Sequence, residues 1–129
     1  MHEHVLTTLR TARYFTLGAE QHAADVWIVC HGYGQLAARF LERFRAIAAD
    51  TRCIVAPEGL SRFYLSESPT ERRVGASWMT KEDRLHEIAD YVRFLDTLHN
   101  RVAGGTTKVT ALGFSQGTAT VCRWAALSA

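Results

Sequence analysis

Short apolar runs and longer amphipathic segments alternate along the chain, and this alternation predicts an α/β domain. Three runs rich in apolar and β-branched residues, at 25–31, 52–56 and 108–114, predict strands that are buried on both faces. The segments at 35–48 and 80–105 repeat apolar residues every three or four positions and predict amphipathic helices. Strands that alternate with such helices favour a mostly parallel sheet with helices on both of its faces.

The second of these helices has the clearer end signals. Thr80 and Asp83 have the spacing of a capping box, Glu82 adds a second acidic residue near the start, and Gly104 and Gly105 predict the end. Its predicted apolar positions are Leu85, Ile88, Ala89, Val92, Leu95 and Leu98. Those of the first helix are Leu36, Phe40, Leu41, Phe44, Ile47 and Ala48.

The remaining segments carry weaker patterns. Residues 5–17 alternate loosely and predict one or two strands, with a turn at 17–20 that includes Glu20. Residues 58–78 are polar and aromatic and predict a long loop. Residues 118–128 predict a further helix, whose apolar side is Val121, Cys122, Ala125 and Ala126. No repeat or linker divides the chain, so we expect a single domain over 1–129.

Composition excludes several classes of function. The formal net charge is +2 and the two signs are interspersed, so the chain has no basic patch of the kind that binds nucleic acid. The longest apolar run is short, which indicates neither a secretory signal nor a membrane span. Three cysteines, Cys30, Cys53 and Cys122, lie in apolar surroundings without metal-site spacing, which favours buried, reduced thiols in the cytoplasm.

The segment from Gly113 to Gly117 reads GFSQG, with a serine between two glycines. It lies between the strand predicted at 108–114 and the helix predicted at 118–128. A strand that turns sharply into a helix exposes the hydroxyl of the central serine, and side chains two positions away would collide. Free N–H groups at the helix start stabilise a developing oxyanion. We therefore interpret Ser115 as a candidate nucleophile.

A second glycine-containing motif, HGYGQ, directly follows the strand predicted at 25–31. Acyl transfer needs two N–H donors for the oxygen of the tetrahedral intermediate, and loops at neighbouring strand ends can aim them at one point. We expect the backbone N–H groups of Tyr33 and Gln116 to form this oxyanion hole, with Gly32 and Gly34 shaping the loop. The alternative interpretation is that HGYG is a plain turn.

The segments VCHGYGQLA, APEGLSRFY, GASWMTKEDRLHEIADYVRFLD and LGFSQGTATVCRWA together resemble the phospholipase/carboxylesterase family of α/β-hydrolases, whose relatives include acyl-protein thioesterases. The resemblance covers nearly the whole chain. It implies an α/β-hydrolase fold and a serine esterase that cleaves small-molecule carboxylic esters or thioesters. Ser115 would be its nucleophile, and Tyr33 and Gln116 its oxyanion hole. The resemblance implies no cofactor and no metal, and it implies that the loop at 58–78 borders the acyl pocket.

The other members of a catalytic triad are missing from the expected place. In this fold the nucleophilic serine is followed by an acid and then by a histidine, but the residues after Ser115 include no Asp, Glu or His. We therefore expect the amino-terminal portion of a longer hydrolase, truncated after the nucleophile and its helix, with little activity of its own. Two alternatives are a non-catalytic module that binds an acyl group or carboxylate, and a fragment that another chain completes.

Other candidate groups are expected to be structural. His31 adjoins the HGYGQ loop, and the resemblance implies a place beneath that loop. We expect Glu58 to cap a loop, and Trp78 and Met79 to belong to the core. The histidines expected to be solvated, partly packed or bystanders are His2, His4, His22, His86 and His99.

The strand predicted at 108–114 has a further consequence. In the α/β-hydrolase fold later strands pair with the free edge of this strand, so a chain that stops at Ala129 leaves an apolar edge uncovered. Uncovered edges promote association. We therefore expect the chain to dimerise or aggregate through this edge.

Overall fold

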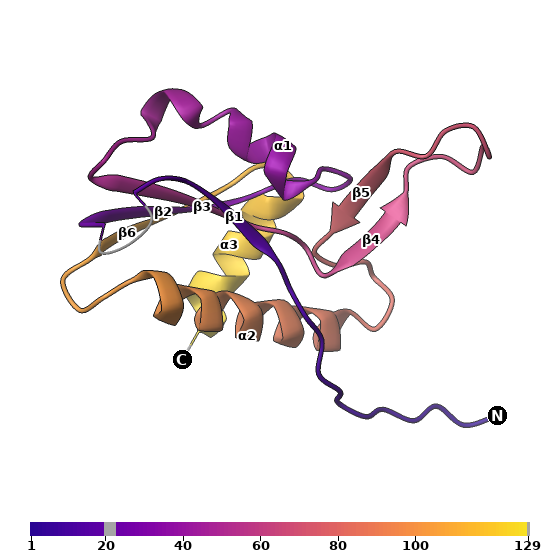
Figure 1. Cartoon of the computed structure of the whole chain (residues 1–129). Coiled ribbons are helices and arrows are strands. Elements are labelled where there is room, and N and C mark those ends of the chain that lie inside the picture. The colour runs from indigo at the N-terminus through magenta and orange to yellow at the C-terminus, as the bar shows by residue number, and fades with distance from the viewer. Residues whose placement is uncertain (20–22, 129) are drawn as a thin grey trace.

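The computed structural model describes residues 1–19 and 23–128, and its main body is a four-stranded sheet with the order β1-β3-β2-β6 (Figure 1). The strands are β1 (Tyr14–Gly18), β2 (Asp25–Cys30), β3 (Arg52–Pro57), β4 (Ser61–Tyr64), β5 (Val74–Ser77) and β6 (Lys108–Gly113). The helices are α1 (Ala37–Glu42), the 3-10 helix η1 (Arg45–Ile47), α2 (Arg84–Val102) and α3 (Gln116–Leu127). Glu20, to which the sequence assigns a turn, His22 and Ala129 lie outside the described residues.

The sheet is mostly parallel, as the sequence predicts. β2 pairs in parallel with β3 on one side and with β6 on the other, so that Cys30 lies opposite Gly113. β1 adds an antiparallel strand on the far side of β3. The carboxyl ends of β2, β3 and β6 therefore meet at one edge of the sheet, where ligands bind in open α/β folds.

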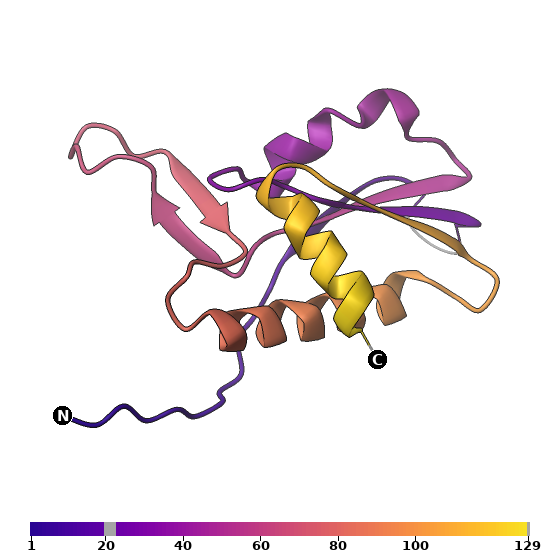
Figure 2. The same ribbon diagram turned by 180° about the vertical axis from the view of Figure 1, so that it is seen from behind.

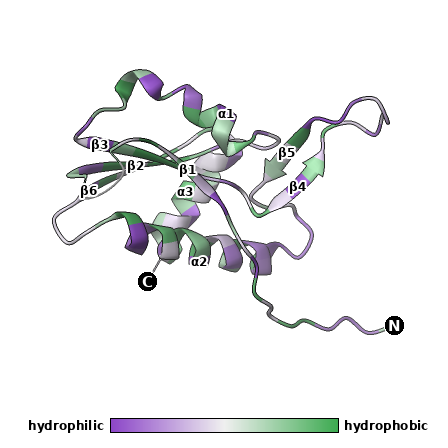
Figure 3. Ribbon diagram, in the orientation of Figure 1, coloured by the Kyte–Doolittle hydropathy of each residue, from purple (hydrophilic) through white to green (hydrophobic). Residues whose placement is uncertain are grey.

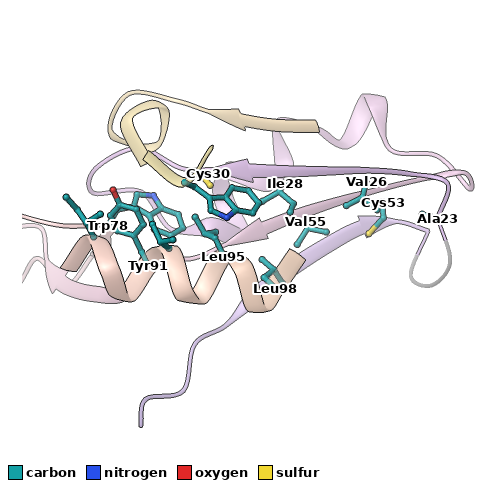
Figure 4. Packing of buried hydrophobic residues seen from close by; sticks show 13 residues of the cluster. Ala23, Val26, Ile28, Cys30, Cys53, Val55, Trp78, Tyr91, Leu95 and Leu98 are labelled. Carbon is teal, nitrogen blue, oxygen red and sulfur yellow. The ribbon is translucent and has the colours of Figure 1, made fainter. Parts of the chain in front are cut away.

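Helices cover both faces of the sheet (Figures 1 and 2). α2 and α3 pack on one face, and their core includes Trp124 of α3. Figure 4 shows Tyr91 and Leu95 of α2 in the same core. α1 packs on the other face, where Phe40 and Leu41 contact the apolar side chains of β2 and β3. Figure 3 shows the hydrophobic colouring of β2 and β3 that this double burial requires. Each fully buried large apolar side chain stabilises the fold by roughly 1.5–3 kcal/mol.

The segment at 58–78, which the sequence predicts to be a loop, contains a two-stranded hairpin of β4 and β5 that projects from the main sheet (Figure 1). Its strands have four residues each, which is too short for a clear alternation. The hairpin is docked by the bridge between Gln35 and Ala76 and by a hydrogen bond of 2.8 Å from the N–H of Gly34 to the Ala76 carbonyl.

The amino-terminal half departs from the prediction in two places. Regular strand structure begins at Tyr14, and residues 1–13 form no strand or helix; their apolar side chains Leu6 and Leu9 are exposed. The helix predicted over 35–48 ends at Glu42, because the next N–H groups bond three residues back and tighten the chain into η1. Arg52 to Pro57 is the buried strand that was expected, one residue longer.

The two carboxyl-terminal helices match their predictions to different degrees: on α2 the predicted positions Ile88, Val92, Leu95 and Leu98 are buried. On α2, Leu85 is exposed and Tyr91 is buried. Asp83 precedes this helix with φ 51° and makes no side-chain cap, so the predicted capping box is wrong. On α3, the buried residues are Gly117, Thr120 and Trp124. Their predicted counterparts Ala125 and Ala126 are exposed.

The prediction of a buried thiol holds for Cys30 and Cys53 and is wrong for Cys122, which is exposed. Gly117 must face the end of β2, and this contact sets the rotation of α3 and turns Cys122 outward. β6 also differs from its prediction: it is half-exposed rather than buried on both faces, and it lies at the edge of the sheet that the described residues form.

Candidate active site

The turn between β6 and α3 holds Ser115 in a sparsely populated backbone conformation. Its φ is 54° and its ψ is −117°, which an L-residue adopts only under constraint from its surroundings. The N–H of Phe114 donates to the Cys30 carbonyl (3.1 Å) and the N–H of Gly117 donates to the Phe114 carbonyl (2.9 Å). Ser115 itself is exposed at the carboxyl edge of the sheet.

The glycines on either side of Ser115 sit against backbone atoms. A Cβ on Gly113 would lie 2.2 Å from the Gly117 carbonyl oxygen, and a Cβ on Gly117 would lie 2.1 Å from the Cys30 carbonyl oxygen. Such distances are far inside van der Waals contact. The turn therefore has room for a side chain at neither position, and the second glycine is required by the end of β2 rather than by the turn itself.

The loop after β2 lies directly against this turn. A Cβ on Gly32 would come within 3.2 Å of the Phe114 carbonyl oxygen. The N–H of Gly32 donates to Oε1 of Gln35 at 2.6 Å, which ties the loop to itself. Gly34 has φ 79°, a left-handed conformation that favours glycine. The loop and the turn thus meet through backbone atoms at the same edge of the sheet.

Two backbone donors at this edge have no acceptor among the described residues. Throughout residues 1–19 and 23–128, the N–H groups of Tyr33 and Gln116 donate to no protein atom. Gln116 begins α3, so its N–H adds to the positive end of the helix dipole. Unpaired donors in a folded protein are usually met by water or ligand. These two groups can therefore donate hydrogen bonds to a negatively charged oxygen without breaking a protein hydrogen bond.

His31 is fully buried beneath the loop and is held on both sides of its ring. Its Nε2 accepts from the N–H of Gly59 (2.9 Å), so Nδ1 carries the proton and donates to the Gly32 carbonyl (2.7 Å). The ring stacks on Trp78 at 5.1 Å. Burial lowers the pKa of His31, outweighing the Gly32 carbonyl and Glu58 charge that raise it. The imidazole is thus a neutral structural group with no nitrogen left for Ser115.

The side chain of Gln116 has a positioning role that the sequence did not suggest. Its Oε1 accepts from the N–H of Trp78 (3.0 Å), and its Nε2 donates to the Met79 carbonyl (2.8 Å) and to Oγ of Ser77 (3.1 Å). These bonds attach the start of α3 to the segment after β5. The local sequence carries no signal of them, because the partners lie far away in the chain.

Glu58 organises the end of β3. Its side chain is fully buried and accepts from Arg13 (2.7 Å), from Arg62 (2.6 Å) and from the N–H of Ala37 (3.2 Å). Burial raises the pKa of this carboxyl, but the hydrogen bonds from Arg13, Arg62 and Ala37 outweigh it, so the pKa lies below its usual value. Glu58 therefore links the end of β3 to the residue before β1, to β4 and to the start of α1.

The other histidines of the described residues lie away from Ser115. Nδ1 of His86 is 2.7 Å from Oδ1 of Asp83, a hydrogen bond that raises the pKa of this imidazole. Both residues line a groove of about 830 Å³ between the N-terminal segment and α2, and Ser115 does not border that groove. His99 packs against Trp124. His2 and His4 are in the exposed N-terminal segment.

Two further findings concern the described part of the chain. Within it, no three His, Cys, Asp or Glu side chains gather closely enough to hold a metal ion. None of the helices found there combines the length and apolar character needed to cross a bilayer.

Comparison with known proteins gives a structural likeness and no sequence match. No protein-family model and no curated protein matches the sequence. The crystal structure of esterase PE8 matches this fold with a TM-score of 0.62 and 19% sequence identity, over 89% of this chain and 57% of that chain. The chain thus spans a little over half the length of that esterase. At this identity the likeness shows a shared fold.

Proposed function

We propose that the chain carries the nucleophile and oxyanion hole of a serine hydrolase that cleaves small-molecule carboxylic esters or thioesters. One observation carries the proposal: Ser115 is exposed and held at φ 54° in a turn that meets the loop after β2 at Gly32, and the N–H groups of Tyr33 in that loop and of Gln116 are unpaired among the described residues. This is the arrangement that acyl transfer needs. The esterase-like fold supports it, and the sequence motifs support the phospholipase/carboxylesterase family in particular.

In the proposed reaction, Ser115 Oγ gives its proton to a general base and bonds to the substrate's carbonyl carbon. The carbonyl oxygen takes the displaced electron pair and accepts hydrogen bonds from Tyr33 and Gln116. When that oxygen re-forms the double bond, the alcohol or thiol leaves with a proton, and an acyl-serine remains for hydrolysis by water. Among residues 1–19 and 23–128, no imidazole hydrogen-bonds to Ser115, so the base has to come from outside this set.

The proposal includes a cytoplasmic location for the protein. It is supported by Cys30, which is buried and whose thiol pKa burial raises to about 12. Such a thiol needs no disulfide partner. Nucleic acid and membranes are not among the proposed partners.

The test is acylation of Ser115 by p-nitrophenyl butyrate and by a fluorophosphonate probe, followed by peptide mass spectrometry. We expect slow labelling at Ser115 and a p-nitrophenol release that Ser115→Ala abolishes. Ser128→Ala is the matched control, because Ser128 bonds to Asp96 at the far end of α3. Equal release by the wild type and Ser115→Ala, with no label at Ser115, contradicts the proposal.

A second function is favoured by the missing base: the same N–H pair could hold a carboxylate without turnover. In that case butyrate binds with a shift of the Tyr33 and Gln116 amide NMR signals, and neither the ester nor the probe labels Ser115. Labelling of Ser115 decides for the hydrolase.

A further inference from the structure

Trp78, which directly follows β5, contacts both segments that carry the candidate oxyanion donors. Its indole N–H donates to the His31 carbonyl at 2.8 Å, and its ring stacks on the His31 ring with a centroid distance of 5.1 Å. Its backbone N–H donates to Oε1 of Gln116 at 3.0 Å. Trp78 is 2% exposed, so these contacts are shielded from water. One residue thus joins the loop after β2 to the start of α3.

The contact with His31 reaches the N–H of Tyr33 through one peptide group. Nδ1 of His31 donates to the Gly32 carbonyl at 2.7 Å. That carbonyl and the N–H of Tyr33 belong to the same trans peptide group, so they point in opposite directions. A shift of the His31 ring therefore turns the Tyr33 donor. Because Trp78 contacts both the ring and the carbonyl of His31, it limits this movement.

The contact with Gln116 fixes the second donor. Nε2 of Gln116 donates to the Met79 carbonyl (2.8 Å) and to Oγ of Ser77 (3.1 Å), and Oγ of Ser77 itself donates to the Met79 carbonyl (2.8 Å). Both polar atoms of the Gln116 side chain are therefore bound by residues 77–79. The first residue of α3 is held at a fixed place relative to Trp78.

We propose that Trp78 is a positioning residue that sets the separation of the two oxyanion donors. The inference rests on the proposed function, because it concerns the same N–H groups of Tyr33 and Gln116. Two donors stabilise one oxygen only when both lie about 2.7–3.1 Å from it, so their separation matters. The Trp78 ring also packs edge to face against Tyr91 of α2 at 6.1 Å, which anchors it in the core (Figure 4).

The experiment compares Trp78→Phe with Trp124→Phe, because each change removes one buried indole N–H. Trp124 is 8% exposed and donates to Oδ1 of Asp96 at 2.9 Å, about two helical turns beyond Gln116. Butyrate is titrated while the amide NMR signals of the two donors are followed. We expect its dissociation constant to rise about 10-fold in Trp78→Phe and to change less than twofold in Trp124→Phe.

The NMR signals separate a positioning role from a general loss of structure. Trp78→Phe keeps the backbone N–H that binds Gln116, so the Gln116 signal should still shift with butyrate, whereas the Tyr33 signal should lose most of its shift. Gln116→Met acts on the other donor, since it keeps the backbone N–H and removes the side-chain bonds to residues 77–79. We expect the opposite pattern there, again with about 10-fold weaker binding.

The same variants are compared in the rate at which the fluorophosphonate labels Ser115, since its phosphoryl oxygen needs the same donors. We expect slower labelling of Trp78→Phe and Gln116→Met and an unchanged rate for Trp124→Phe. Urea unfolding checks that each variant folds. The half-buried side chain of Gln116 makes Gln116→Met the milder change, and its result decides if Trp78→Phe does not fold.

The outcomes distinguish this inference from the proposed function. Labelling and butyrate binding that are equal in Trp78→Phe and Trp124→Phe, or unchanged in Gln116→Met, would overturn the positioning role and leave the hydrolase proposal standing. Butyrate binding that weakens as expected in a protein whose Ser115 is never labelled would support the positioning role and contradict the hydrolase. A wild type that neither binds butyrate nor takes the label would overturn both.

Discussion

Two turns at the carboxyl edge of the sheet hold their shape by different means. The turn after β6 is packed backbone against backbone, so that a Cβ on Gly117 would lie 2.1 Å from the Cys30 carbonyl oxygen. The turn after β3 is held by the buried carboxylate of Glu58, which binds Arg13 and Arg62. The first depends on the absence of side chains and the second on charge. Only the second should respond to pH.

The largest expected effect follows from adding a methyl group to the first turn. Gly117→Ala has to displace the end of β2 or the start of α3, and we expect it to lower the free energy of unfolding by about 3 kcal/mol or to prevent folding. Gly105→Ala is the matched control, because a Cβ there meets no atom within 4 Å. Urea denaturation followed by circular dichroism measures both. Equal stability of the two variants would refute the account of a backbone-packed turn.

The second turn is tested by removing its charge. Glu58→Gln leaves Arg13 and Arg62 without their anion, and both guanidinium groups are partly exposed to water. We therefore expect a loss of about 2 kcal/mol at neutral pH, less than for a fully buried ion pair. Glu42→Gln removes an exposed pair with Arg45 and is expected to change stability very little.

The pH dependence has a definite sign. The pKa of Glu58 is lowered in the folded state, so its contribution is fully present above the unfolded-state pKa of about 4.3 and is lost as pH falls through the folded-state value. The stability difference between wild type and Glu58→Gln should therefore shrink on acidification below pH 4. A difference that stays constant down to pH 2 would show that the carboxylate charge is not what holds this turn.

The smallest expected effect concerns strain at Ser115. Glycine adopts φ 54° without steric cost, so Ser115→Gly should raise the free energy of unfolding by roughly 0.5–1 kcal/mol, while Ser115→Ala, which keeps a Cβ, should leave it unchanged. Thermal and urea unfolding measure the difference. A loss of stability in Ser115→Gly would mean that the turn imposes no strain on the serine.

The same two turns show how far sequence reasoning reaches. The glycine spacing around Ser115 and the runs of β2, β3 and β6 are local, so the parallel sheet and the turn after β6 could be predicted. The four-residue strands of the hairpin could not, since they depend on docking against Gln35. Which face of α3 is buried could not be predicted either, because the contact between Gly117 and Cys30 fixes the rotation of the helix, and the helix's own periodicity does not.

In the candidate site, too, some features could be predicted from local sequence motifs and others could not. The sequence motifs predict an oxyanion hole at Tyr33 and Gln116, and this role stays a prediction; their N–H groups are unpaired among the described residues. Other contacts of the site join residues from distant parts of the chain. Gln116 forms hydrogen bonds with Trp78 and Met79, and Arg13 donates to Glu58. A single sequence contains no signal for such pairs, because their polar side chains would be equally acceptable on a solvated surface.

The place of β6 in the sheet also affects the order in which the described strands can pair during folding. β6 is the last strand in the described chain, yet it pairs with β2, near the other end. During synthesis from the amino terminus, β2 can pair with β3 early, but its pairing with β6 has to wait until the residues through Gly113 have emerged, and pairings of such long sequence separation form slowly. Ser115 reaches its conformation only after that pairing is made. Within the described chain, the turn that holds Ser115 therefore depends on the strand pairing with the longest sequence separation.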